Sequence, residues 1–347
     1  MHNTSKSLAI VGIGGAVFFL LDLPLAWMMG SMCITTVFAL RGVELNVHPP
    51  LKNIMVAVLG VMLGSNFSPD TLGNMMQWSN GLLLSFVNIF ISMSLVYFYY
   101  RKVGKLDRTT AYFSAAPGGF NIMYEVGEAK GGDGRKIALI HATRILLLVM
   151  TVPIAFRYGV EIQETKASLP LFGRWEELTQ YGWLFLAAVA GYWGGKVLKI
   201  PAYHLMGPLF AAAAFELSGF IDVKPPLLVI YAAQLVIGTS LGLRFLGISV
   251  REVRQVILLS CGSTALMIAI ASLLAVLGST FVGVSIPGLI LALSPGGLAE
   301  MSLVALALGI DVAFVSIIHA IRITFIIGVI PLAYPVVSHF WTRRKKA

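Results

Sequence analysis

Long apolar segments dominate this chain and decide what kind of fold it can adopt. Uninterrupted apolar runs of about 18 to 25 residues recur from Leu8 to Val337, and each can cross a hydrocarbon core roughly 30 Å thick. Hydrophobic residues make up 57% of the sequence, charged residues only 12%, and the mean hydropathy is +0.85. Soluble globular domains do not have this composition. The sequence therefore predicts an all-α polytopic membrane protein.

The few charged residues are placed as in the loops of a membrane protein. Basic residues cluster between apolar runs, at 101–108 and 343–346, which is typical of cytoplasmic loops. No helix-turn-helix, zinc-ligand spacing or soluble basic face accompanies the net charge of +9, so we expect no nucleic-acid partner. Cys33 and Cys261 lie in apolar runs and indicate neither a disulfide nor a metal site.

The chain carries an internal duplication. The segment APGGFNIM at 116–123 aligns with SPGGLAEM at 294–301, and this alignment, which we call the repeat register, continues without a gap. Between 111–156 and 289–334, 15 of 46 aligned positions are identical. The aligned pairs include Asp133 with Asp311, His141 with His319, Arg144 with Arg322, and Pro153 with Pro331.

The duplication divides the chain into two homologous membrane repeats and a linker. Repeat 1 covers 1–157, repeat 2 covers 181–347, and 158–180 is a polar linker too mixed in composition to span a membrane. Each repeat contains six apolar elements, so we expect about 10 to 12 membrane elements in all. The expected elements lie at about 7–22, 24–40, 51–66, 81–100, 109–128 and 136–157, and at about 181–197, 201–218, 226–243, 256–280, 285–308 and 312–337.

The fifth element of each repeat contains a Pro-Gly-Gly sequence in its middle. Proline removes a helix hydrogen bond and the two glycines are the most flexible residues available, so the helix must break there. Broken backbone at membrane depth is tolerated only where it is buried in protein or lines a wet cavity. The element could cross as a discontinuous helix or turn back as a re-entrant hairpin.

Loop charge favours the hairpin and, with it, inverted repeats. If both fifth elements turn back, each repeat crosses five times, and cytoplasmic segments hold 19 Lys and Arg against 4 outside. If both cross completely, the repeats are parallel and the counts become 15 and 8. Both topologies place the two termini in the cytoplasm, and we expect a multi-pass membrane protein.

A Pro-Gly-Gly break exposes the ends of two half-helices near the middle of the bilayer. The N-terminal end offers free N–H donors and partial positive charge to an anion, and the carbonyl end suits a cation. Two such breaks in inverted repeats form the substrate and ion site of many secondary transporters. The alternative interpretation is a kink that only allows close helix packing.

The two His-x-x-Arg pairs, His141 with Arg144 and His319 with Arg322, each share one face of a helix. An arginine at that depth is costly unless it is paired or faces water. The pairs could therefore recognise an anionic substrate, or they could be buried tethers that fix the broken helix. Duplication is expected in either case.

Acidic residues near the breaks differ between the repeats. Glu300 follows Gly297 by three residues, whereas Glu125 follows Gly119 by six, so Glu300 is the better candidate for a proton carrier. Either acid could instead simply pair with an arginine. The full set of candidate substrate- or ion-binding residues is Pro117, Gly118, Gly119, Asn121, Glu125, His141, Arg144, Ser294, Pro295, Gly296, Gly297, Glu300, His319 and Arg322.

The chain resembles the AbrB family of bacterial inner-membrane proteins. The resemblance lies in the duplicated unit, which contains A/S-PGG, then an acidic position, and then an x-x-R helix that continues to a proline. The resemblance covers the chain from LPLAWMMG at Leu23 to the helix that contains Pro331. The label "ammonia monooxygenase" used in that family would require clustered copper ligands, but the six histidines are scattered, so we expect no metal. Pro-Gly-Gly in a broken helix is also similar, more weakly, to the bile-acid and sodium-proton antiporter superfamily, which implies transport.

These observations predict a secondary transporter of a small, anionic solute or ion that works by alternating access, with its site between the two broken helices. We expect no enzymatic activity and no cofactor beyond H⁺ or Na⁺ as a coupling ion. The expected partners are a small-molecule or ion substrate, the lipid bilayer and, in a homo-oligomer, further copies of the chain. The alternative is a membrane sensor or regulatory protein that binds a ligand and acts through a partner; a membrane enzyme would need a catalytic constellation beyond His-x-x-Arg.

Overall fold

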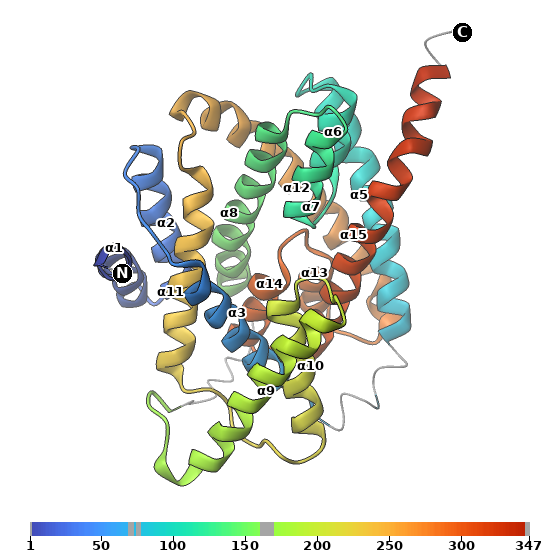
Figure 1. Ribbon diagram of the computed structural model, residues 1–347. Coiled ribbons are helices and arrows are strands. Elements are labelled where there is room, and N and C mark those ends of the chain that lie inside the picture. Colours follow the sequence, from blue (N-terminus) through green and yellow to red (C-terminus); the bar gives the residue numbers. More distant parts are fainter. Residues whose placement is uncertain (1, 69–72, 74–77, 160–169, 344–347) are drawn as a thin grey trace.

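The computed structural model describes residues 2–68, 73, 78–159 and 170–343 (Figure 1). In these residues the chain is helical and contains no β-strand. Residues 160–169 of the predicted linker and 344–346 of the C-terminal basic cluster lie outside the described residues. The elements are α1 (His2–Leu20), α2 (Ala26–Leu40), α3 (Pro49–Gly64), α5 (Trp78–Lys102), α6 (Arg108–Ala115), α7 (Phe120–Ala129), α8 (Gly134–Gly159), η1 (Trp175–Glu177), α9 (Leu178–Val197), α10 (Tyr203–Leu217), α11 (Leu227–Gly242), η2 (Leu243–Phe245), α12 (Val250–Val282), α13 (Ile286–Leu293), α14 (Leu298–Ala307) and α15 (Val312–Arg343).

Several of these helices are long and apolar enough to cross a membrane, as predicted for an all-α polytopic protein. Five such segments occur among the described residues, and shorter apolar helices such as α2 and α3 accompany them. The five segments are Trp78–Lys102, Gly134–Gly159, Leu227–Phe245, Arg254–Val282 and Val312–His339.

Each Pro-Gly-Gly element is a re-entrant hairpin. The α6 and α7 helices lie beside one another in Figure 1, and the backbone N–H of Asp133, after α7, donates to Thr110 Oγ1 near the start of α6 at 2.8 Å. In the second repeat, a β-carbon at Gly288, near the start of α13, would lie 3.4 Å from Ile310, just beyond α14. The chain therefore enters and leaves each element at the same end, and the element folds back on itself.

Equivalent long helices of the two repeats run in opposite directions in Figure 1. The α8 helix descends from the end that carries α6 and α7, whereas α15 ascends toward that end. In the same view α5 ascends and α12 descends. The α6–α7 loops and the end of α15 therefore lie at one end of the molecule.

Glycines bring helices of different repeats into close contact. The α3 helix packs on α10, where a β-carbon at Gly64 would lie 2.7 Å from the Ala212 side chain. The α11 helix packs on α2 in the same way, with Gly242 against Thr35 at 2.6 Å. Such short distances leave room only for a hydrogen, which is how small residues let membrane helices approach closely.

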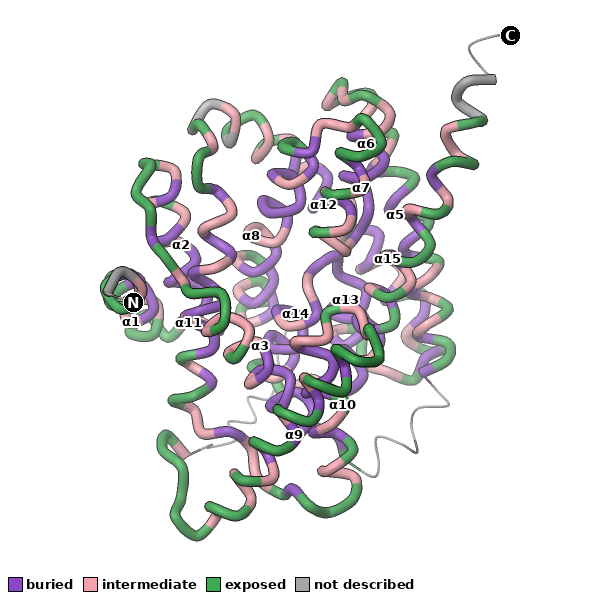
Figure 2. Tube along the Cα trace, in the orientation of Figure 1, coloured by how far each residue is buried: buried purple, intermediate pink, exposed green. Residues whose placement is uncertain are grey.

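Burial increases from the outer helices toward the hairpins. Figure 2 shows buried residues concentrated where α3, α8, α13 and α14 meet, and the apolar core there includes Leu59, Leu148, Leu291 and Val304. Large apolar side chains on outer helices, such as Leu20, are exposed. An apolar exterior fits a lipid environment, in which apolar surface outside carries no penalty.

Candidate functional site

The breaks in the two hairpins follow directly from Pro-Gly-Gly. The α6 helix ends at Ala115, and Ala116 is extended because a residue before proline avoids the helical conformation. Gly119 then takes a left-handed conformation, with φ of +67°, and α7 begins. In the second repeat the corresponding Gly297 is extended, with φ of −77°. The two hairpins therefore share Pro-Gly-Gly but differ in the backbone conformation of its second glycine.

The arginines of the two His-x-x-Arg pairs bind the carbonyl ends of α6 and α13. Arg144 donates to the carbonyls of Ser114 at 2.5 Å and Ala116 at 2.6 Å. These carbonyls have no partner within their own helix, and the C-terminal end of a helix is electronegative, so a guanidinium stabilises it.

Arg322 makes the equivalent contacts in the second repeat. It donates to the carbonyls of Ala292 at 3.3 Å, Ser294 at 2.6 Å and Gly296 at 2.8 Å. In the repeat register, the first two acceptors align with Ser114 and Ala116, the two acceptors of Arg144. Both arginines are 1% exposed.

The paired histidines are tethers of the same kind. His141 Nε2 lies 3.0 Å from the Phe113 carbonyl, and His319 Nε2 lies 2.9 Å from the carbonyl of Leu291, which aligns with Phe113. Arg322 also donates to His319 Nδ1 at 2.8 Å. Since Nδ1 accepts, Nε2 must carry the proton that is donated to Leu291, so His319 is neutral. These bonds favour the tether interpretation of His-x-x-Arg over direct recognition of an anion.

The tips of the two hairpins meet at a cavity of about 550 Å³. It is lined by residues at the N-terminal ends of α7 and α14, together with residues of α8, α15, η2 and the loop before α10. Nine of the predicted residues line this cavity: Gly118, Gly119, Asn121, His141, Arg144, Pro295, Gly296, Gly297 and Glu300. The other five do not: Pro117, Glu125, Ser294, His319 and Arg322.

Glu300 and Glu125 have different surroundings. Glu300 is 8% exposed and lies in the first turn of α14, where its carboxylate folds back over Gly297 so closely that a β-carbon there would overlap it. Glu125 is exposed on the outer part of α7. Of the two acids, only Glu300 faces the cavity.

Two basic residues that sequence reasoning did not select also line the cavity, Arg244 of η2 and Lys199 of the loop before α10. The Arg244 guanidinium lies 4.2 Å from the centre of the Phe120 ring at the α7 tip, a cation–π contact. Its Nη1 is buried and has no hydrogen-bond partner among the described residues. The Nε of Arg144 is also buried without a partner, but both Nη atoms of Arg144 bind carbonyls, whereas Arg244 makes only the cation–π contact among the described residues.

The alignment of the two repeats contained a signal for these two residues. Arg244 aligns with Asn66, and Lys199 aligns with Asp22, so both positions become basic only in repeat 2. Lys199 and Asp22 share a left-handed backbone conformation, with φ of 53° and 52°, which supports the alignment. Comparing charges across the repeats, instead of seeking identities, would have found them.

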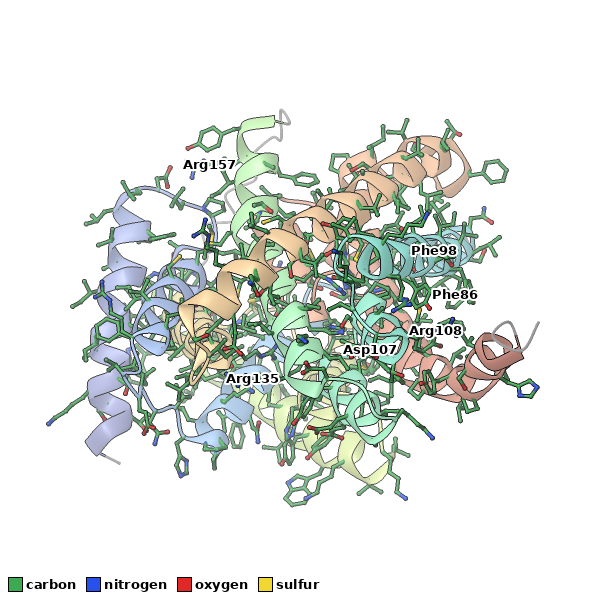
Figure 3. The ribbon with its side chains drawn as sticks, turned by 90° about the horizontal axis from the view of Figure 1, so that it is seen from above. Phe86, Phe98, Asp107, Arg108, Arg135 and Arg157 are labelled. Atoms are coloured by element: carbon green, nitrogen blue, oxygen red, sulfur yellow. The ribbon has the colours of Figure 1, made fainter. Side chains whose placement is uncertain are left out.

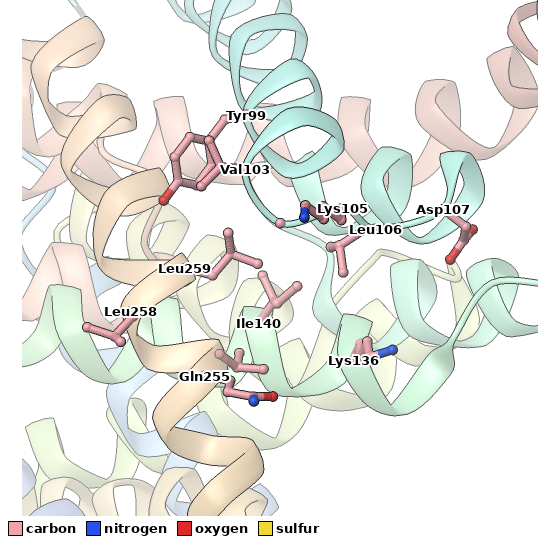
Figure 4. A pocket seen from close by; sticks show the side chains of 12 residues that line it. Tyr99, Val103, Lys105, Leu106, Asp107, Lys136, Ile140, Gln255, Leu258 and Leu259 are labelled. Atoms are coloured by element: carbon pink, nitrogen blue, oxygen red, sulfur yellow. The ribbon is translucent and has the colours of Figure 1, made fainter.

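Two further cavities lie away from the hairpin tips. One of about 500 Å³ has apolar walls of Ile140, Leu258 and Leu259 beside the charged Lys105 and Asp107 (Figure 4). None of the predicted residues lines this cavity.

The third cavity, of about 310 Å³, includes Asp22 and Lys224. Viewed from above, Arg135 and Arg157 lie at opposite ends of α8, and Arg157 pairs with Asp22 at 2.5 Å (Figure 3). The loop from Asp22 to Leu25 thus lines a separate cavity from its counterpart in repeat 2, the loop from Lys199 to Ala202. In the described part of the chain no three His, Cys, Asp or Glu side chains are grouped so as to hold a metal ion.

Comparison with known proteins places this arrangement in a family. A family model described as "Transition state regulatory protein AbrB" matches residues 27–338, which include both hairpins and both His-x-x-Arg pairs. The chain belongs to the AbrB family. It is 25% identical to "Uncharacterized protein YhjN" of Bacillus subtilis (strain 168), over 97% of this chain and 94% of that protein. It is 24% identical to "Putative regulator AbrB" of Escherichia coli (strain K12), over 93% and 92% of the two chains.

Proposed function

We propose that this AbrB-family protein is a secondary transporter that carries a small organic anion by alternating access. The observation that carries the proposal is the cavity at the meeting point of two broken hairpins, which is lined by Arg244, a residue whose Nη1 has no hydrogen-bond partner among the described residues. Buried guanidinium groups bind carboxylates in bidentate fashion, and an anion also gains from the N-terminal ends of α7 and α14.

The cavity also suits the body of an organic anion. Ile145, Ile323 and Ile327 form an apolar wall, while Asn121 and Lys199 add polar groups. Ligand sites combine an apolar lining with a few placed polar groups in this way, and 550 Å³ lies within their usual range of about 300 to 1,000 Å³.

Alternating access in this proposal depends on two inverted repeats of five crossings each. The opposite directions of α8 and α15, the hairpin geometry and the contacts that recur in the repeat register support it. The basic loops around α6 and α7 and the start of α12 mark one end as cytoplasmic by the positive-inside rule. We place the protein in the inner membrane with both termini in the cytoplasm.

A second candidate function is a regulator that binds a ligand in the same cavity and acts through a partner. The names of the family model and of the E. coli relative favour it. The two functions differ in one measurable property, because a transporter accumulates its ligand across a sealed membrane and a regulator does not.

The test combines binding with flux. Purified protein is screened by thermal unfolding against benzoate, succinate and inorganic phosphate, where a ligand at 100 times its Kd stabilises by about 2.7 kcal/mol. Radiolabelled forms of the anions that bind are then offered to proteoliposomes. Arg244→Gln should abolish both stabilisation and uptake, whereas Arg135→Gln, a change at an exposed arginine outside the cavity, should retain both. Binding without uptake would support the regulator, and no binding by any of the three anions would contradict the proposed site.

A further inference from the structure

We infer that anion binding in the cavity is coupled to protonation of Glu300, because the ionised carboxylate and the anion compete for the same positive groups. The protein would then take up one proton with each anion and work as a proton–anion symporter. This inference rests on the proposed function and adds the coupling ion to it.

Glu300 is the only carboxyl group among the described residues that line the cavity. The basic groups that act on it through space are Arg244 of η2 and Lys52 of α3. Neither forms an ion pair with it within 4 Å in the described part of the chain. Glu300 is therefore attracted to these groups without being locked to one of them.

The other ionisable groups around Glu300 are already held by backbone. On α8, across the cavity, Arg144 and His141 bind the carbonyl end of α6, and on α15, Arg322 and His319 bind the carbonyl end of α13. Lys199 faces the same cavity from the loop before α10. Arg244 and Lys199 are thus the positive groups of the cavity lining that are not held by backbone, and Lys52 acts on Glu300 from outside the lining.

The Glu300 carboxylate occupies the position where an anion is best stabilised. It lies over Gly297 at the N-terminal end of α14, where the first N–H groups have no acceptor within the helix and the helix end is electropositive. The protein thus supplies its own anion to the site when the cavity is empty. A substrate carboxylate entering beside it would place two negative charges together in a buried site, which strongly favours protonation of one of them.

Protonation of Glu300 removes the competition and adds a donor. A neutral carboxyl group has one O–H that can donate to the incoming anion, while Arg244 is free to form its bidentate contact. The proton comes from the solvent on the side to which the cavity is open and binds the Glu300 carboxylate; no covalent bond other than this O–H forms. Release of the anion on the other side restores the attraction to Arg244 and expels the proton.

The test measures protons directly. Benzoate and succinate are titrated into purified protein by calorimetry in two buffers of different ionisation enthalpy, which gives the number of protons taken up per anion. Wild-type protein should take up about one, and above the pH at which Glu300 ionises the Kd should rise about tenfold per pH unit. Glu300→Gln should bind with no proton uptake and no pH dependence, and Glu128→Gln, which alters an exposed acid on the other hairpin, should behave as wild type.

Each outcome has a definite meaning. Binding to wild-type protein without proton uptake overturns the coupling and leaves the proposed function standing, and this measurement needs no variant to fold. Proton uptake that persists in Glu300→Gln assigns the proton to another group and also overturns the inference. Absence of binding by both probes at every pH is a failure of the proposed function itself.

Discussion

Arg322→Gln separates a structural arginine from a substrate-binding one. Arg322 is 1% exposed and donates to three carbonyl oxygens, two near the end of α13 and one in the break itself. Glutamine is too short to reach all three and carries no charge. The substitution therefore leaves buried carbonyls without donors at the tip of the second hairpin.

The size of the effect follows from those carbonyls. A buried polar group that loses its partner costs about 1 to 3 kcal/mol, so three of them set a gross loss of about 3 to 9 kcal/mol. Removing the guanidinium also relieves its own desolvation penalty of several kcal/mol. The net destabilisation should lie near the lower end of that range, at about 3 kcal/mol.

The assay measures the unfolding of purified protein in one detergent, once by heating and once by denaturant titration. Arg322→Gln and Arg144→Gln should each lower the midpoint strongly. Arg244→Gln should cost only about 1 kcal/mol, because its guanidinium contributes one cation–π contact and no hydrogen bond from Nη1. Arg322→Lys, which keeps the charge but offers fewer donors in a different geometry, should fall between Arg322→Gln and wild type.

The opposite pattern would refute the tether. If Arg322→Gln unfolds like wild-type protein but no longer responds to the anions that stabilise wild type, Arg322 binds substrate and the hydrogen bonds to the hairpin are incidental. A loss of stability in Arg244→Gln as large as that in Arg322→Gln would likewise remove the distinction between the two kinds of arginine.

Three further predictions concern the hairpin tip, the pH profile and the topology. Gly297→Ala places a methyl group where the Glu300 carboxylate lies, so the carboxylate should be displaced and the number of protons taken up per anion should fall below that of wild type; unchanged proton uptake would mean that the carboxylate is not held there. Hydrogen bonds from the N-cap serine of α12 hold the pKa of Glu252 below its ordinary value, so its contribution to stability is present above the pKa of the unfolded state and is lost as the pH falls; in Glu252→Gln the acid side of the stability profile should flatten, and an unchanged profile would contradict this. With both native cysteines replaced by serine, Lys105→Cys should react with an impermeant maleimide only from the cytoplasm and Glu176→Cys only from outside; labelling of both from one side would refute the inverted topology.

The hairpins could be predicted from the sequence because their cause is local. A proline followed by two glycines ends a helix whatever surrounds it, and the internal duplication identified two such sites. The direction of the chain after each break is not local. Thr110, which receives the hydrogen bond that closes the first hairpin, carries no sign of that role in the sequence, and only loop charge favoured a return.

The lining of the cavity was harder to predict, because it is brought together from distant segments. Lys199 and Arg244 lie far before the α14 tip in the sequence and belong to other elements, so spacing within one element gives no information about them. Conversely, His319 and Arg322 satisfy every rule for a functional pair in a membrane helix, yet they bind carbonyls of α13 and of the break and do not themselves line the cavity. A buried charge marks an energetically costly position. Only the groups that it contacts show whether it stabilises the fold or binds a ligand.

Some contacts occur in both repeats and some residues occur in only one of them, and this difference suggests separate roles for the two groups. Contacts that hold the hairpins recur in the repeat register, from Arg144 to Arg322. The two charged side chains to which the proposals give a role in the cavity, Arg244 and Glu300, do not recur, since Arg244 aligns with Asn66 and Glu300 with Ile122. A site that had both groups in both repeats would hold two anions and two protons, and its like charges would repel. An asymmetric cavity on recurring tethers is therefore consistent with the single anion site of the proposed alternating-access cycle.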